Sequence, residues 1–274
     1  MADLEQQNGD GPYIPDDFMY STKVSSCEPQ VRQNFMMKVY SLLSSQLLFT
    51  FAFSYAVARN NGLQTFMFSH MALWWIAMVA SVVTCIWLSF APRAEEVEYS
   101  TSLLNDGIDN DDPQTLPWYV LGRSGKLALL SIFTLCEAYT LSVVTLVYDP
   151  DVVLRALLIT AVIVIGVSLM ALSPRFANVL NSATSIYYWL NWALLLLIGI
   201  GISSMFFGLG SKMNLFYGWL GAIVFTVYLF IDTQLIFRKV YPDEEIKCAM
   251  MLYLDIINLF LSILRILNNS SDDN

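Results

Sequence analysis

The chain has 274 residues, of which 56% are hydrophobic and only 14% carry a charged side chain. Soluble domains carry about 25% charged residues, so this composition excludes a soluble globular protein and indicates an integral membrane protein. The net charge of -9, the scattered basic residues and the lack of a Gly-rich phosphate loop argue against a nucleic-acid or nucleotide site.

The first segment, residues 1–38, is polar, and most of it is rich in Asp, Gln, Gly and Pro. Such a sequence buries too little apolar surface to fold alone, so we expect a disordered cytoplasmic tail. It has no apolar region of the kind found in a cleavable signal peptide. The first hydrophobic span is therefore expected to direct its own insertion.

Seven apolar stretches follow, each long enough to cross roughly 30 Å of hydrocarbon as a helix. They are predicted at 39–58, 71–90, 127–148, 152–172, 187–207, 215–237 and 249–267. The fold class is therefore all-α, a polytopic membrane domain at 39–267 with seven transmembrane helices, followed by a short tail at 268–274.

One long loop, residues 91–126, interrupts this series. It is acidic, and its stretch DGIDNDD superficially resembles a calcium-binding loop. An EF-hand loop needs a central Gly and a final Glu, and this stretch lacks the full pattern. We therefore interpret the loop as a solvated acidic linker. The other connections are mostly short, which favours antiparallel packing of consecutive helices.

The basic residues predict the orientation in the membrane, because Lys and Arg accumulate on the cytoplasmic side. With a cytoplasmic N-terminus, the cytoplasmic segments hold ten of them: Lys23, Arg32, Lys38, Arg93, Arg123, Lys126, Arg175, Arg238, Lys239 and Lys247. The opposite side holds four: Arg59, Arg155, Lys212 and Arg265. Seven spans then place the C-terminus in the lumen, whereas a re-entrant last segment would return it to the cytoplasm.

Two aspartates in the last two spans are the main candidate site. Asp232 lies five residues before the end of the sixth span, and Asp255 lies six residues into the seventh. Both positions are roughly 8–9 Å below the same membrane surface, and the short connection makes the helices neighbours. Ionisable residues inside lipid are costly and usually functional.

Two such carboxyl groups would share a proton, because both cannot ionise cheaply at close range. The pair would be closed while it shares the proton and would open by repulsion when fully charged. Open, it would offer oxygen ligands to a hard cation such as calcium, bound transiently. The alternative is that each aspartate only caps or hydrogen-bonds a neighbouring helix.

Three further polar residues are expected to support the pair. Asn258, about one turn after Asp255, would hydrogen-bond to it. Glu137 lies mid-membrane in the third span and could form a salt bridge with Arg265 that closes the pathway, although Arg265 could instead extend to the interface. At the start of the fifth span, an aromatic group is interpreted as an interfacial belt. It comprises Tyr187, Tyr188, Trp189 and Trp192.

Several segments resemble the transmembrane Bax inhibitor-motif family, and its fungal members in particular. They are VRQNFMMKVYSLLSSQLL (31–48), SIYYWLNW (185–192), GWLGAIVFTVYLFIDTQLIF (218–237) and MLYLDIINLFLSILRIL (251–267). The most specific combination is DTQ near the end of the sixth span with LYLDIINLF in the seventh. The similarity extends from about residue 15 onward.

This resemblance implies a seven-helix fold with a central last helix, and a pH-sensitive calcium leak, mostly of the endoplasmic reticulum, that restrains stress-induced cell death. The family's paired aspartates correspond to Asp232 and Asp255, and its late-helix arginine to Arg265. In bacterial relatives the acidic partner of that arginine lies in the second span, which here contains no acid. Glu137 is the substitute that we consider.

The expected function is therefore a proton-gated calcium leak that modulates calcium stores, the unfolded protein response and cell death, with calcium as the permeating ion and no cofactor. The expected location is the endoplasmic reticulum membrane, with the vacuolar and mitochondrial membranes as alternatives. The expected partners are calcium, the lipid bilayer and cell-death or stress-response proteins.

Three other functions remain as alternatives. A proton/calcium exchanger would use the same aspartates, and a contact regulator would act through its tails without flux. An intramembrane aspartyl protease also carries aspartates on its sixth and seventh spans. The residues before the aspartates, Ile231 and Leu254, do not match the Tyr-Asp and Gly-x-Gly-Asp signatures of such proteases, and we expect no enzyme.

Overall fold

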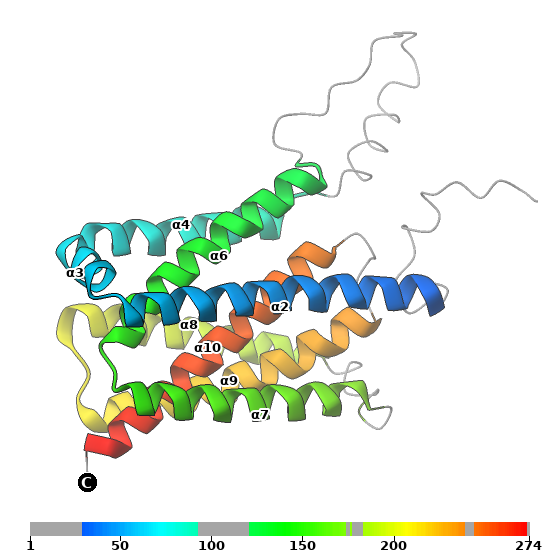
Figure 1. Cartoon of the computed structure of the whole chain (residues 1–274). Coiled ribbons are helices and arrows are strands. Elements are labelled where there is room, and N and C mark those ends of the chain that lie inside the picture. The colour runs from blue at the N-terminus through cyan, green and yellow to red at the C-terminus, as the bar shows by residue number, and fades with distance from the viewer. Residues whose placement is uncertain (1–28, 93–120, 174–175, 177–182, 239–243, 273–274) are drawn as a thin grey trace, which may run out of the picture.

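The computed structural model describes residues 29–92, 121–173, 176, 183–238 and 244–272. Within these residues the chain forms eight helices and no strand (Figure 1). The helices are α2 (Pro29–Arg59), α3 (Asn61–Ser69), α4 (Met71–Phe90), α6 (Arg123–Leu146), α7 (Pro150–Leu172), α8 (Ala183–Phe207), α9 (Ser211–Arg238) and α10 (Glu245–Asp272).

Seven of these described helices, all except α3, are long and apolar enough to cross a membrane. This confirms the predicted all-α polytopic fold. The last helix, α10, runs without interruption for 28 residues, which favours a full span over a re-entrant segment. Residues 1–28 of the expected tail and residues 93–120 of the acidic loop lie outside the described part of the chain.

The first span begins ten residues earlier than expected, because helix α2 starts at Pro29. Residues 29–38 are therefore helical and do not belong to the tail. A proline fits the first position of a helix, where its missing N–H would have no partner. The apolar face also continues into this segment, since Phe35 is buried in the main core together with Val39, the first residue of the predicted span.

The short helix α3 was not expected from the sequence. Its start is fixed by Asn60, whose side-chain oxygen accepts hydrogen bonds from the backbone N–H groups of Gly62 and Leu63 at 2.9 and 3.3 Å. Such N-cap bonds stabilise a helix by about 1 kcal/mol. The connection between the first two spans is thus mostly a short helix of nine residues.

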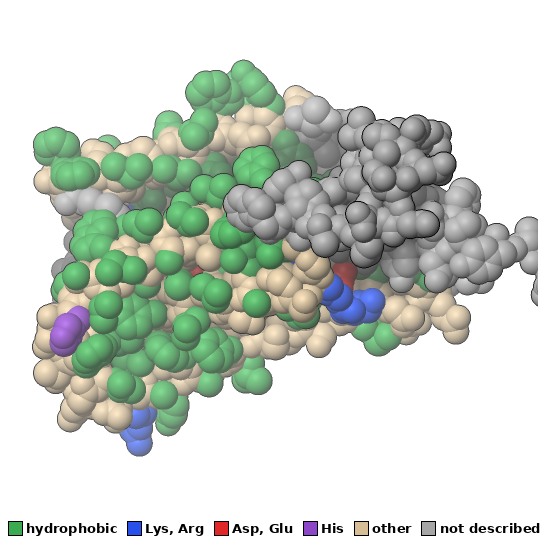
Figure 2. Space-filling view, turned by 90° about the horizontal axis from the view of Figure 1, so that it is seen from above, with side chains coloured by type: hydrophobic (Ala, Val, Ile, Leu, Met, Phe, Trp, Pro, Cys, Tyr) green, Lys and Arg blue, Asp and Glu red, His purple; other side chains and the backbone are tan. Residues whose placement is uncertain are grey.

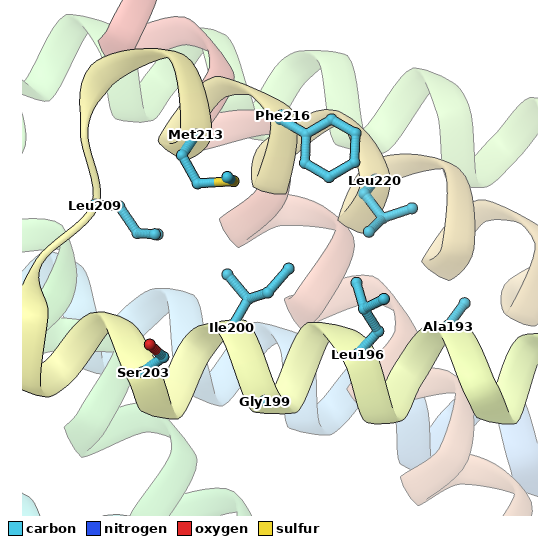
Figure 3. Close-up of a pocket in the computed structure, with 9 residues that line it drawn as sticks. All are labelled: Ala193, Leu196, Gly199, Ile200, Ser203, Leu209, Met213, Phe216 and Leu220. Carbon is cyan, nitrogen blue, oxygen red and sulfur yellow. The ribbon is translucent and has the colours of Figure 1, made fainter.

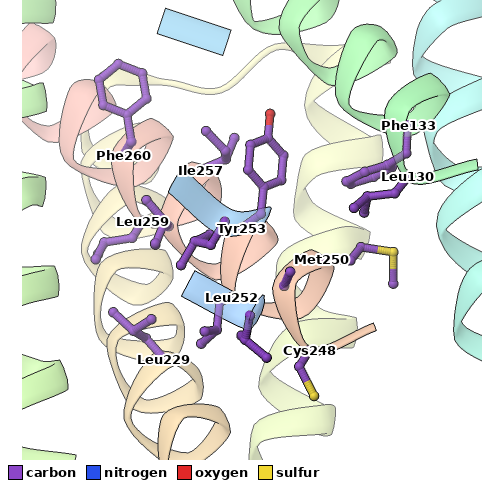
Figure 4. Close-up of a cluster of buried hydrophobic side chains, with 14 of the residues drawn as sticks. Leu130, Phe133, Leu229, Cys248, Met250, Leu252, Tyr253, Ile257, Leu259 and Phe260 are labelled. Carbon is purple, nitrogen blue, oxygen red and sulfur yellow. The ribbon is translucent and has the colours of Figure 1, made fainter. Parts of the chain in front are cut away.

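Helix α10 is the most buried of the seven candidate spans, with 61% of its most apolar stretch buried. It packs mainly on α9 and also contacts α2, α4, α6 and α7. Figure 4 shows Leu130 and Phe133 of α6 on one side of α10 and Leu229 of α9 on the other.

The close approach of α9 and α10 depends on two glycines of α9. A Cβ atom added at Gly221 would lie 2.5 Å from Oγ of Ser262, and one at Gly218 would lie 2.9 Å from Cγ1 of Ile266. Small residues at helix interfaces let the backbones approach closely inside a membrane. The two helices that carry the aspartates are therefore held together by shape as well as by sequence proximity.

The outer surface is apolar, as expected for a membrane-spanning bundle. Figure 2 shows hydrophobic side chains spread over much of the face that it views. The four least buried spans are α8, α4, α2 and α7. In these helices 11%, 17%, 22% and 22% of the most apolar stretch is buried. Contiguous apolar surface of this kind marks contact with a membrane or a partner.

Candidate functional site

The structure brings the two predicted aspartates together. Asp232 of α9 and Asp255 of α10 are only 4% and 7% exposed, and their carboxyl groups are close enough to interact directly. Helices α9 and α10 are adjacent because a connection of six residues, 239–244, joins them. We refer to these two residues as the aspartate pair.

Asp232 is held by a tyrosine from a third helix. The hydroxyl of Tyr187 in α8 donates a hydrogen bond to Oδ1 of Asp232 at 2.5 Å. One turn earlier on α9, the hydroxyl of Tyr228 donates to Oδ1 of Asn191 at 3.0 Å. Tyr187 and Asn191 are four residues apart on α8, and Tyr228 and Asp232 are four residues apart on α9. The two hydrogen bonds therefore join one face of α8 to one face of α9 beside the aspartate pair.

Tyr187 differs from the interpretation made from sequence, which placed it in an interfacial aromatic belt. Its neighbours Tyr188, Trp189 and Trp192 are exposed on the outer surface, whereas Tyr187 points inward to Asp232. The spacing of Tyr187 and Asn191 on one helical face was the available signal. Sequence alone could not show that this face meets α9.

Asp255 has an oxygen without a partner. Its Oδ2 is buried and accepts no hydrogen bond from any described residue. A buried acceptor without a partner is costly, particularly on an ionised group. Either a proton shared with Asp232 or a bound cation could provide the missing partner of this oxygen. The chemistry of the aspartate pair therefore suits exchange of a proton for a cation.

Asn258 does not provide the hydrogen bond expected for Asp255. Its side-chain Nδ2 donates to the backbone carbonyl of Leu254 at 2.8 Å. Polar side chains within helices commonly bond to the carbonyl four residues earlier, because it lies on the same face. The side chain of Asn258 therefore bonds within its own helix.

The expected salt bridge between Glu137 and Arg265 is absent from the described residues. Glu137 of α6 lies beside Ser81 of α4 and near Tyr253 of α10. Arg265 lies twelve residues beyond Tyr253, which is roughly 18 Å along a helix. Its guanidinium carbon instead lies 4.4 Å from the ring centroid of Tyr217 in α9. The two charges occupy different depths, which corrects the sequence-based hypothesis.

Glu137 belongs to a second polar group that sequence reasoning missed. The hydroxyls of Thr50 and Tyr253 are 2.9 Å apart, and Nε2 of Gln46 donates to Oγ1 of Thr134 at 2.9 Å. We call the following residues the Glu137 cluster: Gln46, Thr50, Ser81, Thr134, Glu137 and Tyr253. The cluster joins α2, α4, α6 and α10, and its members are isolated polar residues within apolar spans.

No described group of three or more His, Cys, Asp or Glu side chains could hold a metal ion. Calcium takes six to eight oxygen ligands in stable protein sites. The aspartate pair and the hydroxyl of Tyr187 offer fewer, so water would complete the coordination of any calcium bound there. Such a site would hold the ion only weakly.

Comparisons with known proteins agree with this architecture. Residues 32–272 match the model of the Bax1-I family, described as inhibitor of apoptosis-promoting Bax1. The chain is 63% identical to Bax inhibitor 1 of Saccharomyces cerevisiae over 270 residues, covering 96% of this chain and 91% of the relative. It is 30% identical to mouse protein lifeguard 4, covering 93% and 92% of the two chains.

A viral relative is covered to a similar extent. The chain is 29% identical to the Golgi anti-apoptotic protein of vaccinia virus (strain Lister), with 94% of each protein covered. The match to the family model runs from the first candidate membrane helix to the last. The chain therefore belongs to the Bax1-I family of inhibitors of apoptosis-promoting Bax1.

Proposed function

We propose that this protein is an anti-apoptotic membrane protein that leaks calcium passively from an intracellular store, with the aspartate pair as a proton-sensitive gate. The names of its relatives, Bax inhibitor 1 and Golgi anti-apoptotic protein, support a role in restraining cell death. The observation that carries the gate is the pair itself: two buried carboxyl groups on neighbouring spans, one with an unpartnered oxygen.

The gate would work through the charge of the pair. With one proton between them, Asp232 and Asp255 hold α9 and α10 together, and Tyr187 keeps the carboxyl of Asp232 oriented. Loss of that proton leaves two negative charges facing each other in a poor dielectric, where their repulsion is strong. The helices then separate locally and the freed oxygens attract calcium. The leak therefore increases as pH rises.

The proposed location is the membrane of the endoplasmic reticulum, where lower stored calcium would alter the stress response and cell death. The calcium path would run along α8, α9 and α10, because these helices contribute the polar side chains around the pair.

The decisive experiment measures calcium efflux from proteoliposomes that contain the purified full chain, at about pH 6 and about pH 8, on either side of neutrality. Wild type is compared with Asp232→Asn and Asp255→Asn, which keep the shape of each side chain and remove its charge. We expect faster efflux at the higher pH in wild type and no pH dependence in either variant.

Two controls make the result interpretable. A calcium gradient without a proton gradient separates a leak from an exchanger, because an exchanger would also move protons in fixed proportion. Ser45→Ala changes an exposed residue that bonds only to its own helix and should behave as wild type. Absence of flux at both pH values in folded wild-type protein would overturn the channel function.

In that case, the favoured function is regulation by contact with cell-death or stress-response proteins. The names of the relatives describe an effect on cell death and no transport, which is the observation in favour of this second function. Deleting residues 1–28 would separate the two, since efflux depends on the helical bundle, whereas a regulator that acts through its tail would lose its effect on cell survival.

A further inference from the structure

A cavity lies between α8 and α9, away from the aspartate pair. Its volume is about 600 Å³, and Figure 3 shows side chains from both helices directed into a common space. The lining residues are Ala193, Leu196, Gly199, Ile200, Ser203, Leu209, Met213, Phe216 and Leu220. Only Ser203 among them has a polar side chain, so water has few partners there and the cavity favours an apolar occupant.

The cavity stays open because α8 lacks bulk on this face. A Cβ atom added at Gly199 would meet nothing within 4 Å, and Ala193 and Ser203 are also small. At the end of α8, Gly208 adopts φ 67°, and its N–H bonds to the carbonyl of Ser204 at 3.0 Å. This left-handed turn ends α8, and the chain then returns as α9 across the opening.

The cavity opens sideways on the surface that would face lipid. Leu196, Met213 and Phe216 line it and are still 52%, 50% and 55% exposed. Along α8 the lining runs from Ala193 to Ser203, ten residues or roughly 15 Å. That distance is half of the roughly 30 Å hydrocarbon thickness of a bilayer. The cavity therefore has the depth of one leaflet.

Positive charge lies at the end of the cavity nearest the α8–α9 connection. Lys212 is exposed in the first turn of α9, directly before the lining residue Met213, and this turn contains no acidic residue. The guanidinium of Arg265 lies over Tyr217, the neighbour of the lining residue Phe216. An anionic head group fits this end, and an apolar chain fits the rest.

We propose that this cavity binds one acyl chain of an anionic glycerophospholipid from the leaflet at the α8–α9 connection, with the lipid phosphate beside Lys212. The bound chain provides packing that α8 otherwise lacks, since only 11% of its most apolar stretch is buried and its main contact is α9. This inference goes beyond the proposed leak and does not depend on it.

The test uses the full chain in vesicles of phosphatidylcholine that contain a trace of phosphatidylserine with a photoreactive diazirine on its acyl chain. After irradiation, peptide mapping locates the labelled residues, and unlabelled phosphatidylserine or phosphatidylcholine is added as competitor. We expect labels at Met213, Phe216 or Leu196 in excess over lipid-facing Ile165 of α7, with phosphatidylserine the stronger competitor.

Two variants and a matched control locate the site. Gly199→Leu fills the cavity and should reduce its labelling several-fold, whereas Gly166→Leu, at a glycine of α7 that also has open space around it, should leave it unchanged. Lys212→Gln should retain labelling and lose the preference for phosphatidylserine. If Gly199→Leu does not fold, the competition between phosphatidylserine and phosphatidylcholine for wild-type protein still tests the proposal.

Other outcomes would overturn the proposal. Equal labelling of the cavity and Ile165 would mean that the cavity only contacts bulk lipid. Equal competition by the two lipids would show that the cavity does not prefer an anionic head group. If a second copy of the chain covers the cavity, the cavity residues would stay unlabelled and Met213→Cys would form disulfide-linked dimers.

Discussion

Two buried polar regions flank α10, and they differ in what their acidic residues face. At the aspartate pair, one carboxyl group faces another. In the Glu137 cluster, the carboxyl lies among hydroxyl groups of Ser81 and Tyr253. Tyr253 and Asp255 are two residues apart, about 200° around the helix, so α10 separates the two regions.

This difference predicts different responses to charge. A lone acid among hydroxyl donors can change its protonation without meeting a second negative charge, so nothing forces its helices apart. Paired acids repel each other once both are ionised. We therefore expect the aspartate pair to control opening and the Glu137 cluster to hold α2, α4, α6 and α10 in register.

The largest expected effect comes from separating α9 from α10, on which the aspartate pair depends. Gly221→Leu places a side chain where even a Cβ would lie 2.5 Å from Oγ of Ser262. We expect a loss of about 3 kcal/mol in the free energy of unfolding, measured by denaturation in detergent, together with loss of pH-dependent efflux.

Gly166→Leu is the control for that variant, because a Cβ at Gly166 meets nothing within 4 Å. It should remain within about 0.5 kcal/mol of wild type, as neutral substitutions do. Equal stability of the two leucine variants would mean that close packing of α9 on α10 does not hold the aspartates together.

An intermediate effect is expected at Tyr187. Tyr187→Phe removes the hydroxyl that donates to Asp232 and should reduce the free energy of unfolding by about 2 kcal/mol, as expected for a hydrogen bond to a charged group. It should also shift the pH at which efflux is half-maximal to a higher value, because ionised Asp232 loses a donor that stabilises its charge.

Tyr188→Phe provides the comparison for Tyr187, since Tyr188 lies exposed beside it and contacts Trp189 and Trp192. Its efflux profile should match that of wild type. A shift of the same size in both variants would assign the effect to the aromatic belt and would remove Tyr187 from the gate.

The smallest effect is expected in the Glu137 cluster, and it is the sharpest test of the comparison. Tyr253→Phe removes a hydroxyl contact with Thr50 and should cost about 1 kcal/mol, typical of a neutral hydrogen bond. Efflux should keep its wild-type dependence on pH. A pH profile altered as strongly as in Asp255→Asn would show that the two regions titrate together.

Much of the fold could be predicted from hydrophobicity. Apolar runs of about 20 residues must form helices in a bilayer, because every backbone group needs an internal partner there. The ends of the helices were less predictable. The extension of α2 back to Pro29 depends on burial of Phe35 and Val39, which is a tertiary property.

Some residues of the candidate site could likewise be predicted from the sequence, and others could not. Asp232 and Asp255 could be paired from sequence because a short connection places them at equal depth on adjacent helices. Tyr187 could not, because the face that α8 turns toward α9 is set by packing. The salt bridge between Glu137 and Arg265 was predicted wrongly, since Arg265 has an aromatic neighbour nearer its own depth in Tyr217.

The sequence by itself determined the class of the protein, its seven spans and the depth of its aspartates, because hydrophobicity and helical rise act along one chain. The tertiary structure decided which polar groups meet across helices, which oxygen of Asp255 lacks a partner and where α8 leaves space beside α9. Those features depend on the rotation and spacing of packed helices, and single positions such as Gly199, Gly218 and Gly221 set them.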